Sequence, residues 1–247
     1  AAASAADGYN LFFSVKAVMA IAPHVFPKAR FNAIDDFRPL SQVLTLPHII
    51  TAAPAAPFNN PQQLVQEARK RPGQIDFGSL GVGSQPHVAM EAWARRLDIK
   101  LTHIPYKTTP APDVMAGVVS LYVEASTTAI PSIKAGKIKA LAVSGSARLL
   151  NLPDVPTVTE YQSGLDDAGV IGSTWHALFV PRGTPEDIVL RLSQETVRIT
   201  QMPDVQERLR GLGATPTGTS AAEMSAVLAN DHGVWGRLVR ELRVQAG

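Results

Sequence analysis

The stretch Ile75-Asp-Phe-Gly-Ser-Leu-Gly-Val-Gly-Ser-Gln-Pro-His-Val88 has the pattern of a short strand, a glycine-serine loop and the first turn of a helix. Gly81 and Gly83 allow the backbone to turn tightly and to expose its N–H groups. Pro86 suits the first turn of a helix, whose positive end would point back at the loop. The pattern therefore predicts a strand-loop-helix unit of an α/β protein, with a loop suited to a carboxylate or a phosphate.

Two phosphate-binding motifs do not match this loop. Pro86 stands where a dinucleotide-binding fingerprint has its third glycine, and no Gly-Lys-Ser/Thr sequence ends the run as in a Walker phosphate loop. The glycines also fit a tight strand-to-helix turn that binds nothing. We expect no cofactor here. The loop by itself does not distinguish an anion site from a turn that binds nothing, so the choice depends on the other segments of the chain.

Composition indicates a globular protein without a nucleic-acid partner. The chain has 247 residues, of which 45% are hydrophobic and 18% charged, enough for one large core or two ordinary ones. Its formal net charge is only +2. The basic runs Arg69-Lys-Arg71 and Arg95-Arg96 fall at the ends of predicted helices, where they complement the helix dipole, so they do not indicate a nucleic-acid surface.

The residue types that bind metals are poorly placed for it. The chain has no cysteine, which excludes disulfides, thiol nucleophiles and thiolate metal sites. None of its six histidines pairs with another at the spacing of metal ligands on a helix, so we expect no metal. No apolar run approaches the roughly 18 residues of a membrane span, and the first residues lack the features of a signal peptide.

Short β-rich segments alternate with helical ones over much of the chain. Strands are predicted over 9–14, 43–51, 75–78, 101–106, 120–124, 138–144 and 175–180, with helices between most of them. Such alternation predicts an α/β fold with mostly parallel sheets and right-handed crossovers. Three helices are predicted to end the chain, the last one after the capping box Ser220-Ala-Ala-Glu223.

The helical end needs a sheet to pack against, and the amino-terminal sheet is the natural candidate. The middle of the chain then becomes an inserted domain. We expect lobe 1 to comprise residues 1–53 and 175–247 and lobe 2 to comprise residues 54–174. The crossings would fall near Ala52-Ala53 and Thr174-Trp175, and the carboxyl ends of the strands would face a cleft.

Several motifs occur in a fixed order along nearly the whole chain. They are Asp7-Gly-Tyr-Asn-Leu11, Phe37-Arg-Pro-Leu-Ser-Gln42, Pro72-Gly73, Gly78-Ser-Leu-Gly-Val-Gly-Ser84 with His87, His103-Ile-Pro-Tyr-Lys107, Gly136-Lys137 with Leu141-Ala-Val143, and Leu152-Pro-Asp-Val-Pro-Thr157 with Glu160. Together they resemble the Bug-type receptors. These are the periplasmic solute-binding proteins of tripartite tricarboxylate transporters, and they have the two-lobed type II periplasmic binding protein fold.

The resemblance implies a periplasmic receptor that closes around a small organic carboxylate and presents it to a membrane permease. Its ligand would be a dicarboxylate, a tricarboxylate, an amino acid or an aromatic acid. The loop residues that match the family's binding loop are Ser79, Gly81, Gly83, Ser84 and His87. His87 suits ligand contact and suits holding the loop in place equally well.

Two more site residues are expected from the resemblance. Ser14 follows a predicted strand and would face the cleft from the other lobe. Glu124 stands where an aspartate is common, which would carry its carboxylate one methylene further into the cleft. In the alternative interpretation, Glu124 is a charged residue at the end of a strand and faces solvent.

The sequence departs from the family pattern in two places. Family members usually begin with a further strand and a Pro-Gly-Gly loop, which this sequence lacks; either an upstream segment is missing from it, or ordinary transport binding has been lost. We expect an unpaired edge beside residues 9–14, with self-association through that edge of lobe 1. Thr108 and Thr109 stand where the family usually has Gly-Gly.

Two other function classes remain as alternatives. A small-molecule hydrolase would fit the serines and histidines, but the chain has no Gly-x-Ser-x-Gly nucleophile elbow. A ligand-sensing protein could use the same cleft, although a transcription regulator would need a helix-turn-helix segment, and none is visible. We therefore expect a binding protein that is not an enzyme.

Overall fold

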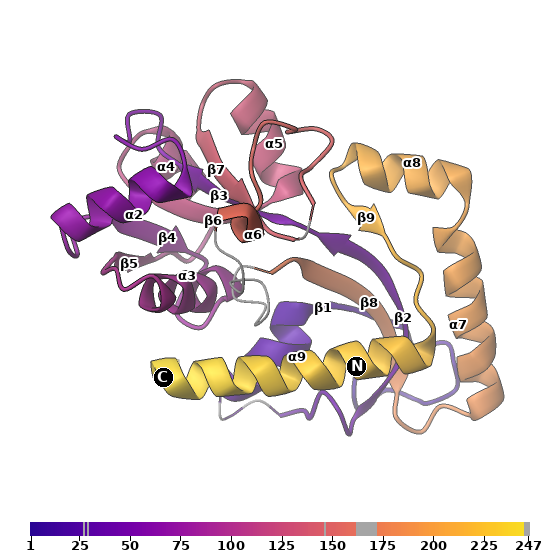
Figure 1. Cartoon of the computed structure of the whole chain (residues 1–247). Coiled ribbons are helices and arrows are strands. Elements are labelled where there is room, and N and C mark those ends of the chain that lie inside the picture. The colour runs from indigo at the N-terminus through magenta and orange to yellow at the C-terminus, as the bar shows by residue number, and fades with distance from the viewer. Residues whose placement is uncertain (27, 29, 146, 162–171, 245–247) are drawn as a thin grey trace. The chain divides into compact units, whose positions relative to one another are not determined.

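A computed structural model describes the chain apart from residues 27, 29, 146, 162–171 and 245–247 (Figure 1). It divides into two compact units, and each is described by itself. Unit 1 contains Ala1–Leu46 and Thr174–Arg240, and unit 2 contains Pro47–Ser173 and Glu241–Val244. Strands and helices alternate in both, which confirms the predicted α/β class.

Unit 1 is built around a four-stranded sheet with the order β1-β8-β2-β9. Its strands are β1 (Phe12–Val15), β2 (Phe37–Leu46), β8 (Thr174–Pro181) and β9 (Thr215–Pro216). Its helices are η1 (Ala17–Ile21), α1 (Ala22–Val25), α7 (Glu186–Thr200), α8 (Pro203–Gly211) and α9 (Ala221–Leu242), of which η1 is a π-helix. The three helices that follow β8 confirm the predicted helical end of the chain.

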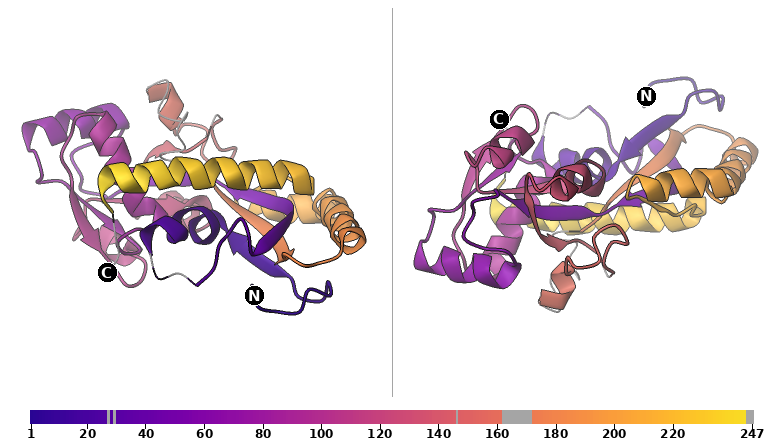
Figure 2. Two further views of the ribbon diagram at one scale, coloured as in Figure 1. Left: turned by 90° about the horizontal axis from the view of Figure 1, so that it is seen from below. Right: turned by 90° about the horizontal axis from the view of Figure 1, so that it is seen from above.

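The alternation of side chains along β8 gives this sheet two apolar faces. Trp175 and Phe179 pack on one face with Met224 of α9. Val180 packs on the opposite face with Val189 of α7. The sheet of unit 1 is therefore covered on both sides, and α9 runs along one of them (Figure 2).

Unit 2 is built around a five-stranded sheet with the order β5-β4-β6-β3-β7. Its strands are β3 (His48–Ala52), β4 (Asp76–Ser79), β5 (Thr102–Pro105), β6 (Leu121–Ala125) and β7 (Lys139–Val143). Its helices are α2 (Pro61–Lys70), α3 (Gln85–Arg96), α4 (Ala111–Met115), α5 (Ser126–Lys134) and α6 (Val158–Tyr161). Every residue of β3 is buried, as expected of an inner strand.

The predicted strand over residues 43–51 is two strands in the structure. β2 ends at Leu46 in unit 1 and β3 begins at His48 in unit 2, with Pro47 between them. Proline has no N–H to donate to a sheet, so a break at this residue is physically reasonable. Because β3 pairs along its length with β6 and β7, residues 48–52 belong to unit 2, and the first crossing falls earlier than the predicted Ala52-Ala53.

The sheets are mixed, whereas the sequence predicted mostly parallel ones. In unit 2, β4 pairs in parallel with β5 and β6, but β3 is antiparallel to both β6 and β7. In unit 1 the described pairings of β8 with β1 and β2, and of β2 with β9, are all antiparallel. The alternation of strands and helices along the chain does not show in which direction β3 and β8 run. Neither strand is joined to its neighbours in the sheet through a βαβ crossover, which would have made them parallel.

Local capping explains where two of the predicted helices begin. The Asn60 side chain accepts a hydrogen bond from the Gln63 N–H at 2.9 Å, and Pro61 starts α2. Before α9, the Ser220 hydroxyl accepts from the Glu223 N–H at 3.2 Å, while the Glu223 carboxylate accepts from the Ser220 N–H at 2.8 Å. This reciprocal pair is the predicted capping box.

The amino-terminal strand β1 lies at one edge of the unit 1 sheet. Among the described residues β1 pairs only with β8, and it forms one end of the strand order. Tyr9, Leu11 and Phe13 are exposed. Self-association through this edge stays a prediction.

Within the described residues, no helix combines the length and the apolar character needed to cross a bilayer.

Two glycines inside α9 have opposite surroundings. A Cβ added to the buried Gly236 would lie 2.7 Å from Cε1 and 3.0 Å from Nε2 of His24. The His24 ring itself packs against the ring of His232, with centroids 4.2 Å apart. A Cβ added to the exposed Gly233 would find its nearest neighbour 3.9 Å away, at the end of the Arg237 side chain.

We therefore expect opposite effects from two alanine substitutions in one helix. Gly233→Ala should raise the free energy of unfolding by about 0.5 to 1 kcal/mol, because alanine loses less backbone entropy in a helix. Gly236→Ala should lower it by about 1 to 3 kcal/mol, because the methyl group displaces His24. Denaturant unfolding of both variants measures the difference, and equal stabilisation by both would contradict the packing at Gly236.

Candidate functional site

The site predicted from the glycine-serine loop lies at one edge of the unit 2 sheet. β4 and β6 are parallel neighbours, so their carboxyl ends meet at the same edge. β4 leads through the loop into α3, and β6 leads directly into α5. The N-termini of α3 and α5 therefore lie at this edge, where the helix dipoles favour an anion.

The loop is held by its own serine hydroxyls. Gly81 and Gly83 have φ angles of +106° and +79°, which glycine adopts readily. The Gly81 N–H donates to Ser79 Oγ at 3.1 Å, and the Ser84 hydroxyl donates to the Gly81 carbonyl at 2.8 Å. Ser79 is completely buried. Both predicted serines thus shape the loop, and their contact with a ligand stays a prediction.

His87 holds the other half of the loop from the first turn of α3. Its Nδ1 accepts a hydrogen bond from the Gly83 N–H at 3.0 Å. Its ring stacks on that of His103, with centroids 3.8 Å apart, and His103 stacks on Phe77. Burial, and secondarily the neighbouring His103, lower the pKa of His87 to about 4. The neutral ring that results is the form that accepts from Gly83.

His103 is a site residue that the sequence pattern did not single out. It lies on β5 directly beside Phe77 of β4, and its Nε2 is 2.6 Å from Ser79 Oγ. Burial lowers the pKa of His103 as well. The signal was available in the motif His103-Ile-Pro-Tyr-Lys107, but only the pairing of β4 with β5 brings the imidazole to the loop.

Glu124 lies at the same edge, on the strand that leads into α5. The residue is 5% exposed, and its Oε2 has no hydrogen-bond partner among the described residues. Burial raises the pKa of the Glu124 carboxyl, and the nearby Thr128 hydroxyl partly offsets this. The structure therefore places Glu124 in the interior at the start of α5, and not in solvent.

Ser14 is not part of this cluster as described, because it belongs to β1 of unit 1. It is 3% exposed, and its hydroxyl has no hydrogen-bond partner among the described residues. The nearby Lys16 is also buried and forms an ion pair of 3.2 Å with Asp231 of α9. The same Asp231 oxygen accepts from the Trp175 indole N–H at 2.7 Å. A role for Ser14 in binding stays a prediction.

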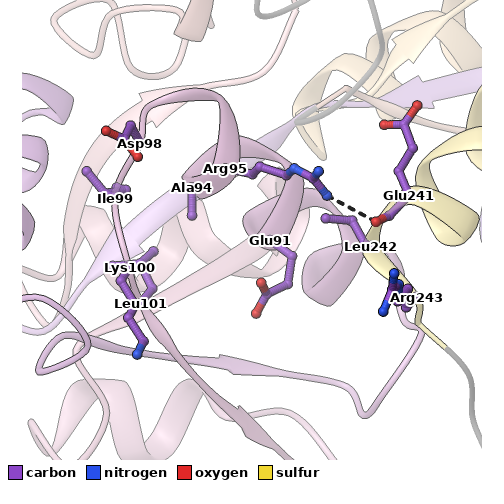
Figure 3. A pocket seen from close by; sticks show the side chains of 10 residues that line it. All are labelled: Glu91, Ala94, Arg95, Asp98, Ile99, Lys100, Leu101, Glu241, Leu242 and Arg243. Carbon is purple, nitrogen blue, oxygen red and sulfur yellow. Dashed lines mark hydrogen bonds between the residues drawn. The ribbon is translucent and has the colours of Figure 1, made fainter.

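A second hollow of unit 2 contains none of the predicted site residues. It has a volume of about 620 Å³ and lies between α3, the segment after it and residues 241–243 (Figure 3). Arg95 donates across it to the Glu241 carbonyl at 3.0 Å. Its lining mixes both signs of charge, with Glu91, Asp98 and Lys100 among its residues. The loop edge, with its converging helix N-termini, is the better candidate for an anion.

The described residues contain no group of three or more histidine, cysteine, aspartate or glutamate side chains arranged to hold a metal ion. The main-chain N–H groups of Gly81, Gly83 and Ser84 donate within the loop, to Ser79, His87 and the Gly81 carbonyl. None of the hydrogen bonds described for residues 79–84 involves a lysine or an arginine.

The sequence matches known proteins over nearly its whole length. Residues 1–244 match the family described as "Tripartite tricarboxylate transporter family receptor". The chain is 31% identical over 97% of its length, and over 71% of the relative, to a UPF0065 protein from the tcbD-tcbE intergenic region of Pseudomonas sp. strain P51. It is 30% identical to protein BugT of Bordetella pertussis, over 97% of this chain and 73% of BugT.

Solved structures agree with these matches. Rpa4515 of R. palustris with adipate superimposes with a TM-score of 0.86 and 26% identity, over 99% of this chain and 81% of that one. The periplasmic binding protein BugD gives 0.82 and 28% over the same shares. MatC of Rhodopseudomonas palustris with bound malate gives 0.80 and 27%, over 96% of this chain and 81% of that one. These neighbours confirm the predicted periplasmic binding protein fold.

The hydrogen bond between Gly83 and His87 should make the stability of the protein depend on pH. A protonated Nδ1 cannot accept this bond, and the folded pKa of about 4 lies below the ordinary 6.5. The stabilisation is fully present above about pH 6.5 and is lost as the pH falls toward 4. We therefore expect the stability advantage of the wild type over His87→Leu to shrink across this window.

Denaturant unfolding of both proteins between pH 4 and pH 7.5 measures this difference. Burial also lowers the pKa values of His24, His103, His176 and His232, but these residues are present in both proteins. An advantage that stays constant with pH would mean that His87 does not hold the loop in its neutral form.

Proposed function

Because the chain belongs to the tripartite tricarboxylate transporter receptor family, we propose that it captures a small organic carboxylate in the periplasm for a membrane permease. The observation that carries this proposal is the meeting of two helix N-termini at the loop edge of unit 2. Receptors of this kind bind a solute and release it unchanged, and the chain is not an enzyme.

The proposed ligand contacts are main-chain N–H groups at this edge other than those of Gly81, Gly83 and Ser84, which donate within the loop, together with the N-termini of α3 and α5. Gly81 and Gly83 keep the loop free of side-chain bulk, and Ser79, Ser84 and His87 hold its shape. Main-chain N–H groups suit a carboxylate because they carry partial positive charge without a competing counter-ion. Glu124 completes the proposed site in unit 2.

Dicarboxylates are the first ligands to test. Adipate and malate are bound in the neighbouring structures of Rpa4515 and MatC, which supports a ligand of this class. The Ser79–His103 pair does not favour the hydrolase alternative. Ser79 is completely buried, and its hydroxyl, besides contacting His103, bonds to both the N–H and the carbonyl of Gly81 in the loop.

A ligand screen tests the proposed chemistry. We expect adipate, malate, succinate or benzoate to raise the melting temperature, and glucose, spermidine and AMP to leave it unchanged. Gly83→Val should abolish the response, because a β-branched residue cannot keep the loop at a φ of +79°.

Gly136→Val is the matched control for this substitution. Gly136 has a φ of +66°, and a Cβ there would find no atom within 4 Å, so valine introduces similar backbone strain away from the loop. The Gly136→Val protein should keep its carboxylate response. A response to glucose with none to any carboxylate would refute the proposed ligand class.

Calorimetry of Ser84→Ala tests the role of the loop hydroxyl. The variant loses the hydrogen bond to the Gly81 carbonyl, so binding should weaken by about 0.5 to 1.5 kcal/mol, the usual net value of one such bond. Ligand recovered after long incubation with the wild type should be chemically unchanged. Loss of affinity by several orders of magnitude, or steady product formation, would contradict a purely structural hydroxyl.

A further inference from the structure

The position of Glu124 raises a question that the proposed carboxylate site does not answer. A carboxylate ligand would bind at an edge where the protein itself places a buried carboxyl group. Glu124 is the residue before Ala125, the N-cap of α5. Its strand neighbour β4 continues into the loop, and the β4–β6 register sets Gly78 beside Tyr122, so that the first loop residue, Leu80, and Glu124 each follow this pair by two positions.

The Glu124 side chain lies on a defined face of the sheet. It shares that face with Tyr122 on its own strand and with Ile49, its partner on β3. α5 covers this face, because Ile49 packs with Ala129 and Ile130. The carboxyl therefore lies among apolar side chains at the start of α5, beside the Thr128 hydroxyl.

Within the described part of the chain, no cation pairs with the Glu124 carboxyl. The ion pairs of the described residues do not include it, and its Oε2 has no hydrogen-bond partner among them. Elements packed against β6 carry these titratable groups: His48 on β3; Asp76 on β4; His87, Glu91, Arg95 and Arg96 on α3; Asp113 on α4; Lys134 on α5; and Tyr122 on β6 itself. The shift of Glu124 toward its neutral form comes from burial, and none of these groups opposes it.

A second negative charge at this edge would be unfavourable. Two carboxylates that share a poorly solvated site do not both stay ionised, and one of them takes up a proton. A neutral carboxyl, unlike an ionised one, has an O–H to donate. The unpartnered Oε2 is the atom of Glu124 that is available for such a bond.

We propose that Glu124 in its neutral form donates a hydrogen bond to the bound carboxylate, so that each ligand molecule is captured together with one proton. At a pH above the pKa of Glu124 in the free protein, the proton comes from the solvent as the ligand binds, is held between Glu124 and the ligand, and returns to the solvent on release. Glu124 thereby selects ligands that offer an acceptor at this position over ligands that offer an ammonium group. This inference rests on the proposed function of the same site.

Calorimetry of the wild-type protein measures the proton directly. Titration with adipate and with malate at pH 7.5, in HEPES and in Tris, gives the number of protons taken up from the dependence of the heat on buffer ionisation. We expect close to one proton per ligand. Affinity should fall about tenfold per pH unit on the alkaline side of the Glu124 pKa. Binding of either acid without proton uptake would overturn the proposal.

The substitution Glu124→Gln separates Glu124 from other proton sources. Glutamine has nearly the same shape and donates through its amide without titrating. The variant should bind the same acids with no proton uptake and with an affinity that is constant between pH 6.5 and 8. Retention of the wild-type pH dependence would overturn the proposal.

Glu91→Gln is the matched control. Burial also raises the pKa of Glu91, but this residue lies on α3 beside the second hollow (Figure 3). The Glu91→Gln protein should keep both the proton uptake and the pH dependence of the wild type.

The outcomes for the two proposals differ. If neither the wild type nor Glu124→Gln binds any carboxylate of the screen at any pH, the proposed function fails. If both bind carboxylates equally and without a proton, the function stands and the role of Glu124 is refuted. Tight binding of an amino acid that is lost in Glu124→Gln would mean that Glu124 is ionised and pairs with an ammonium group.

Discussion

The parallel pairing of β4 with β6 is the constraint on which the candidate site depends. Phe77 lies beside Leu121 and Gly78 beside Tyr122, so both strands end at the same edge and each is followed by a helix. Close packing maintains the arrangement, because a Cβ at Gly78 would come within 2.6 Å of Pro110. A side chain there would separate the segment after β5 from the sheet, and the loop would lose its support.

The polar groups of the loop are used mainly to define the shape of the backbone. The Ser79 and Ser84 hydroxyls bond to Gly81, and His87 accepts from Gly83. The stack of Phe77, His103 and His87 keeps both imidazoles away from water, and burial lowers their pKa values. The side chains that hold the loop are therefore neutral.

Unit 1 differs from the candidate site of unit 2 in that its buried charge is paired with an opposite charge. Lys16, at the end of β1, bonds to Asp231 of α9, and Trp175 of β8 donates to the same carboxylate. These contacts join a strand end and a helix that lie far apart in the sequence. A buried ion pair costs desolvation, and removing one partner would leave an uncompensated charge. The triad therefore specifies where α9 lies against the sheet of unit 1.

Local features could be predicted from the sequence alone, because they depend on hydrogen bonds between residues a few positions apart. The caps at Asn60 and Ser220 and the turn at Gly81 and Gly83 are of this kind. The ordered motifs also identified the family. Only the tertiary structure decided that β2 and β3 separate at Pro47, that β3 and β8 run antiparallel to their neighbours, and that His103 reaches Ser79. It also decided that Glu124 is buried with a free oxygen. These features depend on strand register and on burial, which arise from contacts between distant segments, and no local pattern encodes them.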